Sequence, residues 1–153
     1  MITSAFLADH LDSIPTLAGW FRAQWPDYHA NWSQAEMEQD FLEDTARDRL
    51  PSRLVAFESG ELAGTIILRE QGSETLAEFQ PELGGLYVAA SHRGHGIATE
   101  LVRAGMQLAR QQGYDTVYAT TVAAAGILER LGWEFIKPVV YQDGPVALYR
   151  CQL

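Results

Sequence analysis

The sequence predicts one α/β (α+β) domain over residues 1–153, built around a mixed sheet. Three observations lead to this class. Residues 83–112 follow the order strand, glycine loop, helix. Before them, a strand, two helices and two further strands are expected, and after them a strand, a short helix and two strands. With 47% hydrophobic residues, the chain can form one packed core, and no change in composition marks a second domain.

The first strand is expected at residues 2–7, and a helix follows it. Ser13 is a good N-cap for this helix, and Pro15 is tolerated in its first turn. Pro26 ends the helix because a proline ring clashes with the preceding turn. The apolar stripe of the helix consists of Leu17, Trp20, Phe21 and Trp25.

A second, acidic helix is predicted to begin at a capping box formed by Ser33 and Glu36 and to continue to about Arg47. Met37 and Phe41 are expected to face inward. The acidic residues of this segment either form a solvated surface or attract a cationic substrate, and they are Glu36, Glu38, Asp40, Glu43, Asp44 and Asp48.

A three-strand meander is expected next. Residues 53–57 and 62–68 are strands, and the turn between them, at 58–61, contains Ser-Gly, which favours a tight hairpin. Residues 71–80 form a polar loop, and the third strand opens at Pro81.

The third strand ends in Leu86, Tyr87 and Val88, and the glycine loop at 93–98 follows it. The helix after the loop is strongly amphipathic. Its apolar stripe is Ile97, Leu101, Ala104 and Leu108, and its polar stripe is Glu100, Arg103, Gln107 and Gln111.

The C-terminal part is predicted to contain a strand at 114–121, a short helix at 126–131 and a closing hairpin. The hairpin strands are 135–141 and 146–152, with a turn at 143–145. A helix between two strands of one sheet implies a right-handed parallel crossover, so the sheet is mixed.

The glycine loop is typical of a phosphate site. Gly94 and Gly96 lie at the start of a helix, where unpaired N–H groups and the positive end of the helix dipole attract anions. Ile97 follows Gly96, which excludes the Gly-Lys-Ser/Thr of a Walker A loop. A dinucleotide fingerprint is disfavoured because Thr99 replaces a small residue and Asp115 lies at the wrong end of the next strand. A turn that only packs a helix on a sheet is the remaining alternative.

The loop resembles the acyl-CoA loop of the GNAT superfamily of N-acyltransferases. That signature is Arg or Gln, two residues, Gly, one residue, then Gly or Ala, and here Arg93, Gly96 and Ala98 match it, with Val88 five residues ahead. Residues 126–135 resemble the family's late helix and its Leu-Gly-Phe/Trp turn. The two motifs and the strand between them cover residues 83–135, about a third of the chain.

This resemblance implies a mostly antiparallel sheet of about seven strands flanked by about four helices. It implies acetyl-CoA as co-substrate, with pantetheine on the strand at Leu86, Tyr87 and Val88. It also implies that the pyrophosphate binds main-chain N–H groups of the loop, at Arg93, Gly94, His95, Gly96, Ile97, Ala98 and Thr99.

Glu82 is the candidate general base. It stands six residues before Val88, the base position in the histone-acetylating branch of the superfamily. On a strand it shares a face with Gly84 and Leu86, and this face is expected to point toward the acceptor. A surface glutamate at a strand start is the alternative.

The family's usual general acid is missing. Many members have Tyr where this chain has Leu128, and Asn where it has Thr121. Either the thiolate leaves without an acid, or another tyrosine such as Tyr118 or Tyr141 substitutes.

No metal is expected. The single cysteine, Cys151, cannot form an internal disulfide or a cysteine metal site, and the histidines show no ligand spacing that we recognise. His92 and His95 flank the loop, where side chains are expected to face solvent or the nucleotide without an acid–base role.

Four aromatic residues are assigned to packing. Trp133 and Phe135 are expected in the core, and Trp20 and Trp25 are expected to pack on the sheet, with the wall of the acceptor pocket as the alternative.

A net charge of −9 argues against a nucleic-acid partner. No apolar run approaches the roughly 20 residues of a membrane span, and no signal peptide is recognised. A single cysteine suits a reducing compartment, so we expect a cytoplasmic protein. A monomer and a homodimer are both compatible with the sequence.

The expected function is transfer of an acetyl group from acetyl-CoA to a primary amine, by direct attack in a ternary complex. The acceptor is a small molecule or a peptide, with a cationic amine as one option. The alternative is a catalytically weak acyl-CoA-binding module that senses or regulates, because Leu128 replaces the tyrosine.

Overall fold

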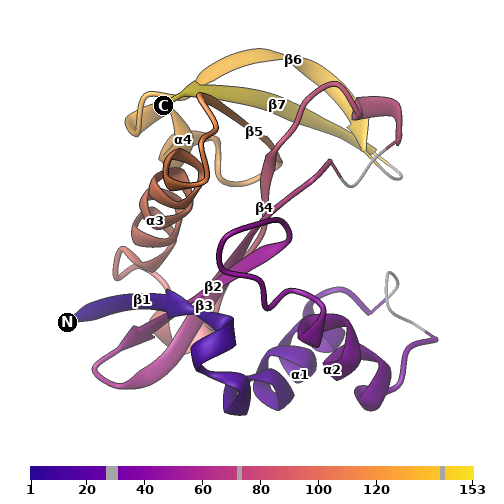
Figure 1. Cartoon of the computed structure of the whole chain (residues 1–153), viewed down its shortest axis with the longest axis vertical. Helices are drawn as coiled ribbons and strands as arrows, with labels where there is room; N and C mark the ends of the chain where they lie inside the picture. The colour runs from indigo at the N-terminus through magenta and orange to yellow at the C-terminus, as the bar shows by residue number, and fades with distance from the viewer. Residues whose placement is uncertain (27–30, 72–73, 142–143) are drawn as a thin grey trace.

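A computed structural model describes residues 1–26, 31–71, 74–141 and 144–153. Its seven strands form one sheet in the order β1-β2-β3-β4-β5-β7-β6, and the β4–β5 pair is parallel whereas the others are antiparallel (Figure 1). The strands are β1 (Ile2–Phe6), β2 (Ser52–Glu58), β3 (Glu61–Arg69), β4 (Glu82–Val88), β5 (Thr116–Thr121), β6 (Glu134–Tyr141) and β7 (Gly144–Gln152). The predicted fold class is confirmed.

Helices cover both faces of the sheet (Figure 1). The long helix α3 packs on β1 to β5, and α4 follows β5 and contacts α3 and β6. Helices α1 and α2 pack against each other on the opposite face, where they form a second apolar cluster with Val55 of β2. The helices are α1 (Ile14–Gln24), α2 (Gln34–Leu42), α3 (Ile97–Gln111) and α4 (Ala125–Arg130), and short 3-10 turns lie at Leu7–Asp9, Leu11–Ser13, Glu74–Leu76 and Ala90–His92.

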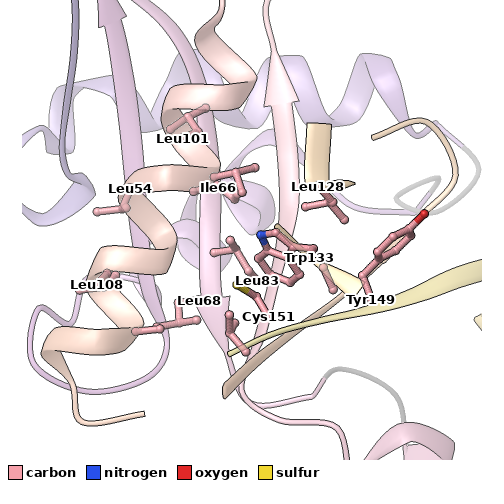
Figure 2. Packing of buried hydrophobic residues seen from close by; sticks show 14 of the residues in the cluster. Leu54, Ile66, Leu68, Leu83, Leu101, Leu108, Leu128, Trp133, Tyr149 and Cys151 are labelled. Atoms are coloured by element: carbon pink, nitrogen blue, oxygen red, sulfur yellow. The ribbon is translucent and has the colours of Figure 1, made fainter. Parts of the chain in front are cut away.

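The main core lies between α3 and the sheet (Figure 2). Its members on α3 include Ile97, Leu101 and Leu108, as the apolar stripe predicts, whereas Ala104 is only half-buried. Other core residues of this cluster include Leu54, Ile66, Leu68, Leu83, Leu128, Trp133, Tyr149 and Cys151. Apolar burial at this scale is the main stabilising contribution to a domain of this size.

Gly105 lets α3 approach β4 closely. A Cβ atom built on Gly105 would lie 2.4 Å from Cδ1 and 2.9 Å from Cδ2 of the buried Leu83. A methyl group there would force Leu83 to move, so the absence of a side chain fixes the distance between the helix and the strand.

The hairpin between β2 and β3 is confirmed. Ser59 and Gly60 have φ angles of 51° and 86°, as a two-residue turn with both central residues in the left-handed region requires. The turn therefore brings Glu58 and Glu61 opposite each other in the ladder.

The predicted end of the second helix is wrong. The capping box of Ser33 and Glu36 is present, and Met37 and Phe41 are buried as expected, but α2 ends at Leu42 instead of about Arg47. The chain leaves the helix because the Asp44 carboxylate and carbonyl bind the side chain and backbone N–H of Arg53. This tertiary contact outweighs the helical propensity of the segment.

Two further expectations differ from the structure. Ser13 stands at the N-cap of α1 but belongs to a preceding 3-10 turn, and its side chain makes no capping hydrogen bond. Phe135 is 51% exposed and lies on β6, the edge strand, where its ring packs on Tyr149. Trp133 is buried, as predicted.

In the described part of the chain, each helix is too short or too polar to cross a bilayer. Of the predicted closing turn, residue 143 lies outside the described residues, as do 27–30 and 72–73 of the two predicted loops.

Candidate active site

The parallel strands β4 and β5 separate soon after they meet. Their register contains one pair, Glu82 with Tyr118, and the Tyr118 N–H donates to the carbonyl of Pro81. Beyond this pair, the edge of β4 that faces β5 has no ladder partner among the described strands, so its backbone groups are available to a ligand. On the outer side of each strand the sheet continues with an antiparallel neighbour, β3 beside β4 and β7 beside β5.

A cleft of about 1080 Å³ occupies this separation. It is lined by the length of β4, by the glycine loop and first turn of α3, and by residues 119–124 after the middle of β5. Phe21, Gln24 and Trp25 close it at the α1 end, and Ile127 and Leu128 of α4 lie on its other side. A second, smaller cleft of about 470 Å³ at residues 43–51 contains none of these groups.

A bulge interrupts β4 in the wall of the cleft. The register with β3 shifts because Thr65 pairs with Tyr87 whereas Ile67 pairs with Gly84. Gly85 has a φ of 58°, the left-handed conformation that favours glycine in such bulges. The bulge reorients the strand at Leu86, so its backbone turns where the two strands part.

The glycine loop has the conformation that a phosphate site needs. Gly94 and Gly96 have φ angles of 79° and 88°, and Gly96 is the N-cap of α3. Its carbonyl accepts the first helical hydrogen bond, from the N–H of Glu100. The N–H groups of the first turn, at Ile97, Ala98 and Thr99, have no partner within the helix and lie at the positive end of its dipole.

The Arg93 side chain links the glycine loop to the end of β4. Its Nε donates to the carbonyl oxygen of Val88 at 3.0 Å, and its guanidinium lies 5.9 Å from the centre of the Tyr87 ring. The side chain therefore spans the 3-10 turn at residues 90–92 and holds the two ends of the site in place.

Most of the predicted cofactor residues line the cleft: Leu86, Val88, Arg93, Gly94, Gly96, Ile97, Ala98 and Thr99. Tyr87 and His95 do not. The Tyr87 ring lies on the other face of the sheet against Trp20, Phe21 and Trp25, as strand alternation requires. His95 points to Glu58.

Glu82 lines the cleft and is buried, with 1% of its surface exposed, so it is not a surface glutamate. Its Oε1 accepts a hydrogen bond from Nε of Arg69 at 2.8 Å. It shares a face with Gly84, as expected, since a Cβ on Gly84 would lie 3.3 Å from Glu82 Oε1. The expectation that Leu86 lies on this face is wrong, because the bulge shifts the alternation: Tyr87 pairs with Thr65 on the face of Glu82, and Leu86 packs against the main core on the opposite face. Arg69 pairs with Glu82 across β3 and β4, and no local sequence pattern predicts this partner.

The position of the missing tyrosine also faces the cleft. Leu128 is 3% exposed and lines it, as does Thr121, whose hydroxyl accepts the N–H of Ala124. Tyr118 does not line the cleft, because its ring packs on Phe79. The side chain of Tyr141 is outside what the structure describes.

The acidic residues of α2 and the segment after it do not line the cleft. Asp44 binds the buried Arg53, whose guanidinium also lies over the rings of Phe21 and Phe41. Burial raises the pKa of Asp44 in spite of this partner, which opposes the shift. Of the two tryptophans, Trp25 lines the cleft and is 36% exposed, whereas Trp20 packs on Tyr87.

His92 and His95 do not face only solvent or the cleft. His92 is 9% exposed, and both Nδ1 atoms lie at hydrogen-bond distance from the Glu58 carboxylate, at 2.6 and 2.8 Å. Hydrogen bonds from the His92 and His95 rings lower the pKa of Glu58. Sequence reasoning missed this group because Glu58 lies 34 residues before His92.

Comparison with known proteins agrees with this geometry. The model of the acetyltransferase (GNAT) family matches residues 17–133. N-acetyltransferase 8 of Mus musculus is 34% identical over 104 residues, which cover 67% of this chain and 45% of that protein. The chain thus spans about half the length of the curated relatives it matches.

Solved structures share the fold at low sequence identity. Ribosomal-protein-alanine N-acetyltransferase from Brucella melitensis has a TM-score of 0.73 at 21% identity, over 100% of this chain and 99% of that one. The aminoglycoside acetyltransferase AAC(6')-Ib, solved with coenzyme A, has a TM-score of 0.74 at 18% identity, over 99% and 95%.

Proposed function

Since the chain belongs to the acetyltransferase (GNAT) family, we propose that it is an N-acetyltransferase that moves an acetyl group from acetyl-CoA to a primary amine. The observation that carries this proposal is the glycine loop. Its two left-handed glycines place the first N–H groups of α3 at one end of a cleft large enough for a substrate of this size.

Acetyl-CoA is a substrate here, and the chain offers matching groups along the cleft. The N–H groups of residues 94–99 suit the pyrophosphate. The unpaired edge of β4 at Leu86 and Val88 suits the amides of pantetheine, which need partners that a regular sheet would not leave available. Tyr87 and His95, which the sequence also predicts at this site, would contribute only their backbone, because their side chains point elsewhere.

The reaction needs an amine, a thioester and a proton acceptor. The amine nitrogen attacks the carbonyl carbon, the C–N bond forms, and the C–S bond breaks with release of coenzyme A as thiolate or thiol. We assign Glu82 as the base that takes the proton from the amine, because its carboxylate is buried in the wall of the cleft. Holding the reactants together supplies much of the rate.

Arg69 determines how Glu82 can act. The guanidinium balances the charge of a carboxylate that would otherwise be buried alone, because its Nε donates to Oε1 of Glu82. The side chain of Arg69 is 33% exposed and also lines the cleft, so Arg69 is the solvent-accessible member of the pair and Glu82 is the buried one.

The acceptor enters, on this proposal, from the α1 end beside Phe21, Gln24 and Trp25. This wall is aromatic and contains no acidic residue, and the only carboxylate lining the cleft is Glu82 among the described residues. A cationic acceptor therefore remains a proposal that depends on long-range attraction by the net charge of −9.

Thiol release tests the function directly. The protein is incubated with acetyl-CoA and a panel of amines that includes polyamines, aminoglycosides, amino acids and peptides, and free coenzyme A thiol is measured. We expect release that depends on one class of amine, with an acetylated product of the expected mass. Amine-independent release alone would contradict the proposal.

A catalytically weak acyl-CoA-binding module is the second candidate. Leu128 favours it, because this buried leucine occupies the cleft wall where an acid is expected by resemblance. Tight acetyl-CoA binding in calorimetry without thiol release from any amine would support this candidate. Competition by NAD or ATP at equal concentration would instead indicate a nucleotide site.

A further inference from the structure

We propose that Glu58, His92 and His95 form a site for a zinc-class divalent cation that fastens the glycine loop to the β2–β3 hairpin. One ligand atom from each residue lies within 4.8 Å of the other two. This inference goes beyond the proposed function, since metal binding is measured without acetyl-CoA or an amine.

The three side chains come from separate parts of the fold that converge at one point. Glu58 ends β2, where it pairs with Ile2 of β1 and Glu61 of β3. His92 ends a 3-10 turn after β4, and its N–H donates to the carbonyl of Ala89. His95 lies in the loop between Gly94 and Gly96. Two of the three ligands are therefore held by regular structure before a metal arrives.

The distances require only a small adjustment. Oε1 of Glu58 is 2.6 Å from Nδ1 of His92 and 2.8 Å from Nδ1 of His95. Ligands of a tetrahedral zinc ion at about 2.0–2.2 Å are about 3.4 Å apart, so the carboxylate oxygen and the two ring nitrogens have to separate by roughly 0.6–0.8 Å. Half-exposed His95, at the tip of a glycine loop, can follow this movement.

The ligand chemistry selects the metal. Two imidazoles and one carboxylate suit zinc and its neighbours in the transition series, whereas magnesium and calcium prefer oxygen ligands throughout. Three protein ligands leave one position for water. Each imidazole binds through the Nδ1 lone pair, so a proton that Nδ1 carries in the metal-free protein moves through solvent to Nε2.

A second carboxylate stands behind His92. Oε2 of Glu61 is 3.4 Å from Nε2 of His92, on the side of the ring opposite Glu58. When Nδ1 binds a metal, the Nε2–H group can donate to Glu61, which fixes the ring and its tautomer. The hairpin turn at Ser59 and Gly60 is what brings both carboxylates to the same imidazole.

Zinc titration of the full chain tests the site. Chelator-treated protein without a histidine tag is titrated with Zn²⁺ in a calorimeter, and Co²⁺ is added separately to read its visible spectrum. We expect one Zn²⁺ per chain and the intense bands of four-coordinate Co²⁺. Mg²⁺ at the same concentration should not compete. Slower hydrogen exchange at the amides of 94–97 should accompany Zn²⁺ binding.

Variants locate the ion. His95→Ala and Glu58→Gln should each weaken Zn²⁺ binding by about 100-fold or more, and Glu61→Gln by about 10-fold. His10→Gln is the control for unspecific imidazole binding, because His10 packs on Phe57 and belongs to no such group among the residues that the structure describes. Absence of Zn²⁺ binding, equal competition by Mg²⁺, or unchanged affinity in both His95→Ala and Glu58→Gln would overturn the proposal.

Discussion

The two ends of the β4–β5 cleft are built from different kinds of group. At the glycine loop, the available groups are main-chain N–H groups whose direction depends on two local φ angles. At the α1 end, the available groups are side chains: Phe21 of α1, Trp25 directly after the helix, and the Glu82–Arg69 pair from two strands. We therefore expect the first end to be most sensitive to changes of backbone conformation and the second end to changes of side chain.

The largest effect should come from Gly96→Val. A Cβ atom on Gly96 would meet no neighbouring atom within 4 Å, so the main damage is expected from a φ of 88°, which a β-branched residue rarely adopts. We expect acetyl-CoA affinity to fall by at least about 100-fold, because the loop amides turn away from the phosphates. Calorimetry with acetyl-CoA measures this change.

Gly19→Ala is the matched control for that variant. Gly19 lies within α1, has open space around it and no positive φ, so alanine should leave binding unchanged and raise helix stability slightly. If Gly96→Val bound acetyl-CoA as the parent does, the loop would not be the phosphate site.

Glu82→Gln should separate chemistry from cofactor binding. Loss of a general base costs about 100-fold or more in kcat/KM, whereas acetyl-CoA affinity should stay within about twofold. The variant also leaves Arg69 without its charged partner, so thermal unfolding is measured in parallel to correct for any loss of folded protein. Full kcat/KM across the pH range would remove Glu82 from the mechanism.

A hydrogen bond between Tyr149 and Glu129 joins β7 to α4 beside the cleft, and its contribution to stability can be measured. The Tyr149 hydroxyl donates to Glu129 of α4 at 2.8 Å, and this hydrogen bond, with burial and the negative charge, raises the pKa of Tyr149 above its ordinary value of 10.0. The unfolded chain therefore loses this proton first. The stabilisation is complete below about pH 10 and is lost as the pH rises through the folded-state pKa.

Denaturant unfolding at neutral and alkaline pH measures that effect. Tyr149→Phe should be less stable than the parent near neutral pH and should lose less stability above about pH 10. Parallel pH profiles for the two proteins would show that this hydrogen bond does not contribute.

The smallest effect is expected from the acids of α2. Asp40→Asn with Glu43→Gln removes two exposed charges that do not line the cleft, so KM for a cationic acceptor should change less than about twofold at physiological ionic strength. A large rise in KM, abolished by added salt, would instead support attraction of the acceptor by this segment.

The difference between the two ends explains what could be predicted from sequence. The loop between Arg93 and Thr99 follows from local glycines and a helix start, and the hairpin at 58–61 follows from its turn residues. The pairing of Glu82 with Arg69 and the meeting of Glu58 with His92 join residues distant in sequence. Neither pair has a local pattern, so only the sheet register reveals them.

Contacts between residues distant in sequence also explain two wrong predictions, the end of α2 and the burial of Phe135. The end of α2 depends on the contact of Asp44 with Arg53, and exposure of Phe135 depends on β7 lying between β5 and β6, which leaves β6 at the edge. Neither can be inferred from helical periodicity or strand alternation alone.

The close approach of Gly105 to Leu83 has a consequence for protein engineering. It holds α3 and the strand β4 at a fixed, close distance, whereas α1 and α2 pack in a separate cluster on the opposite face. A chimera that receives α1 and α2 from another acetyltransferase should therefore still bind acetyl-CoA, whereas its specificity for the amine acceptor should change.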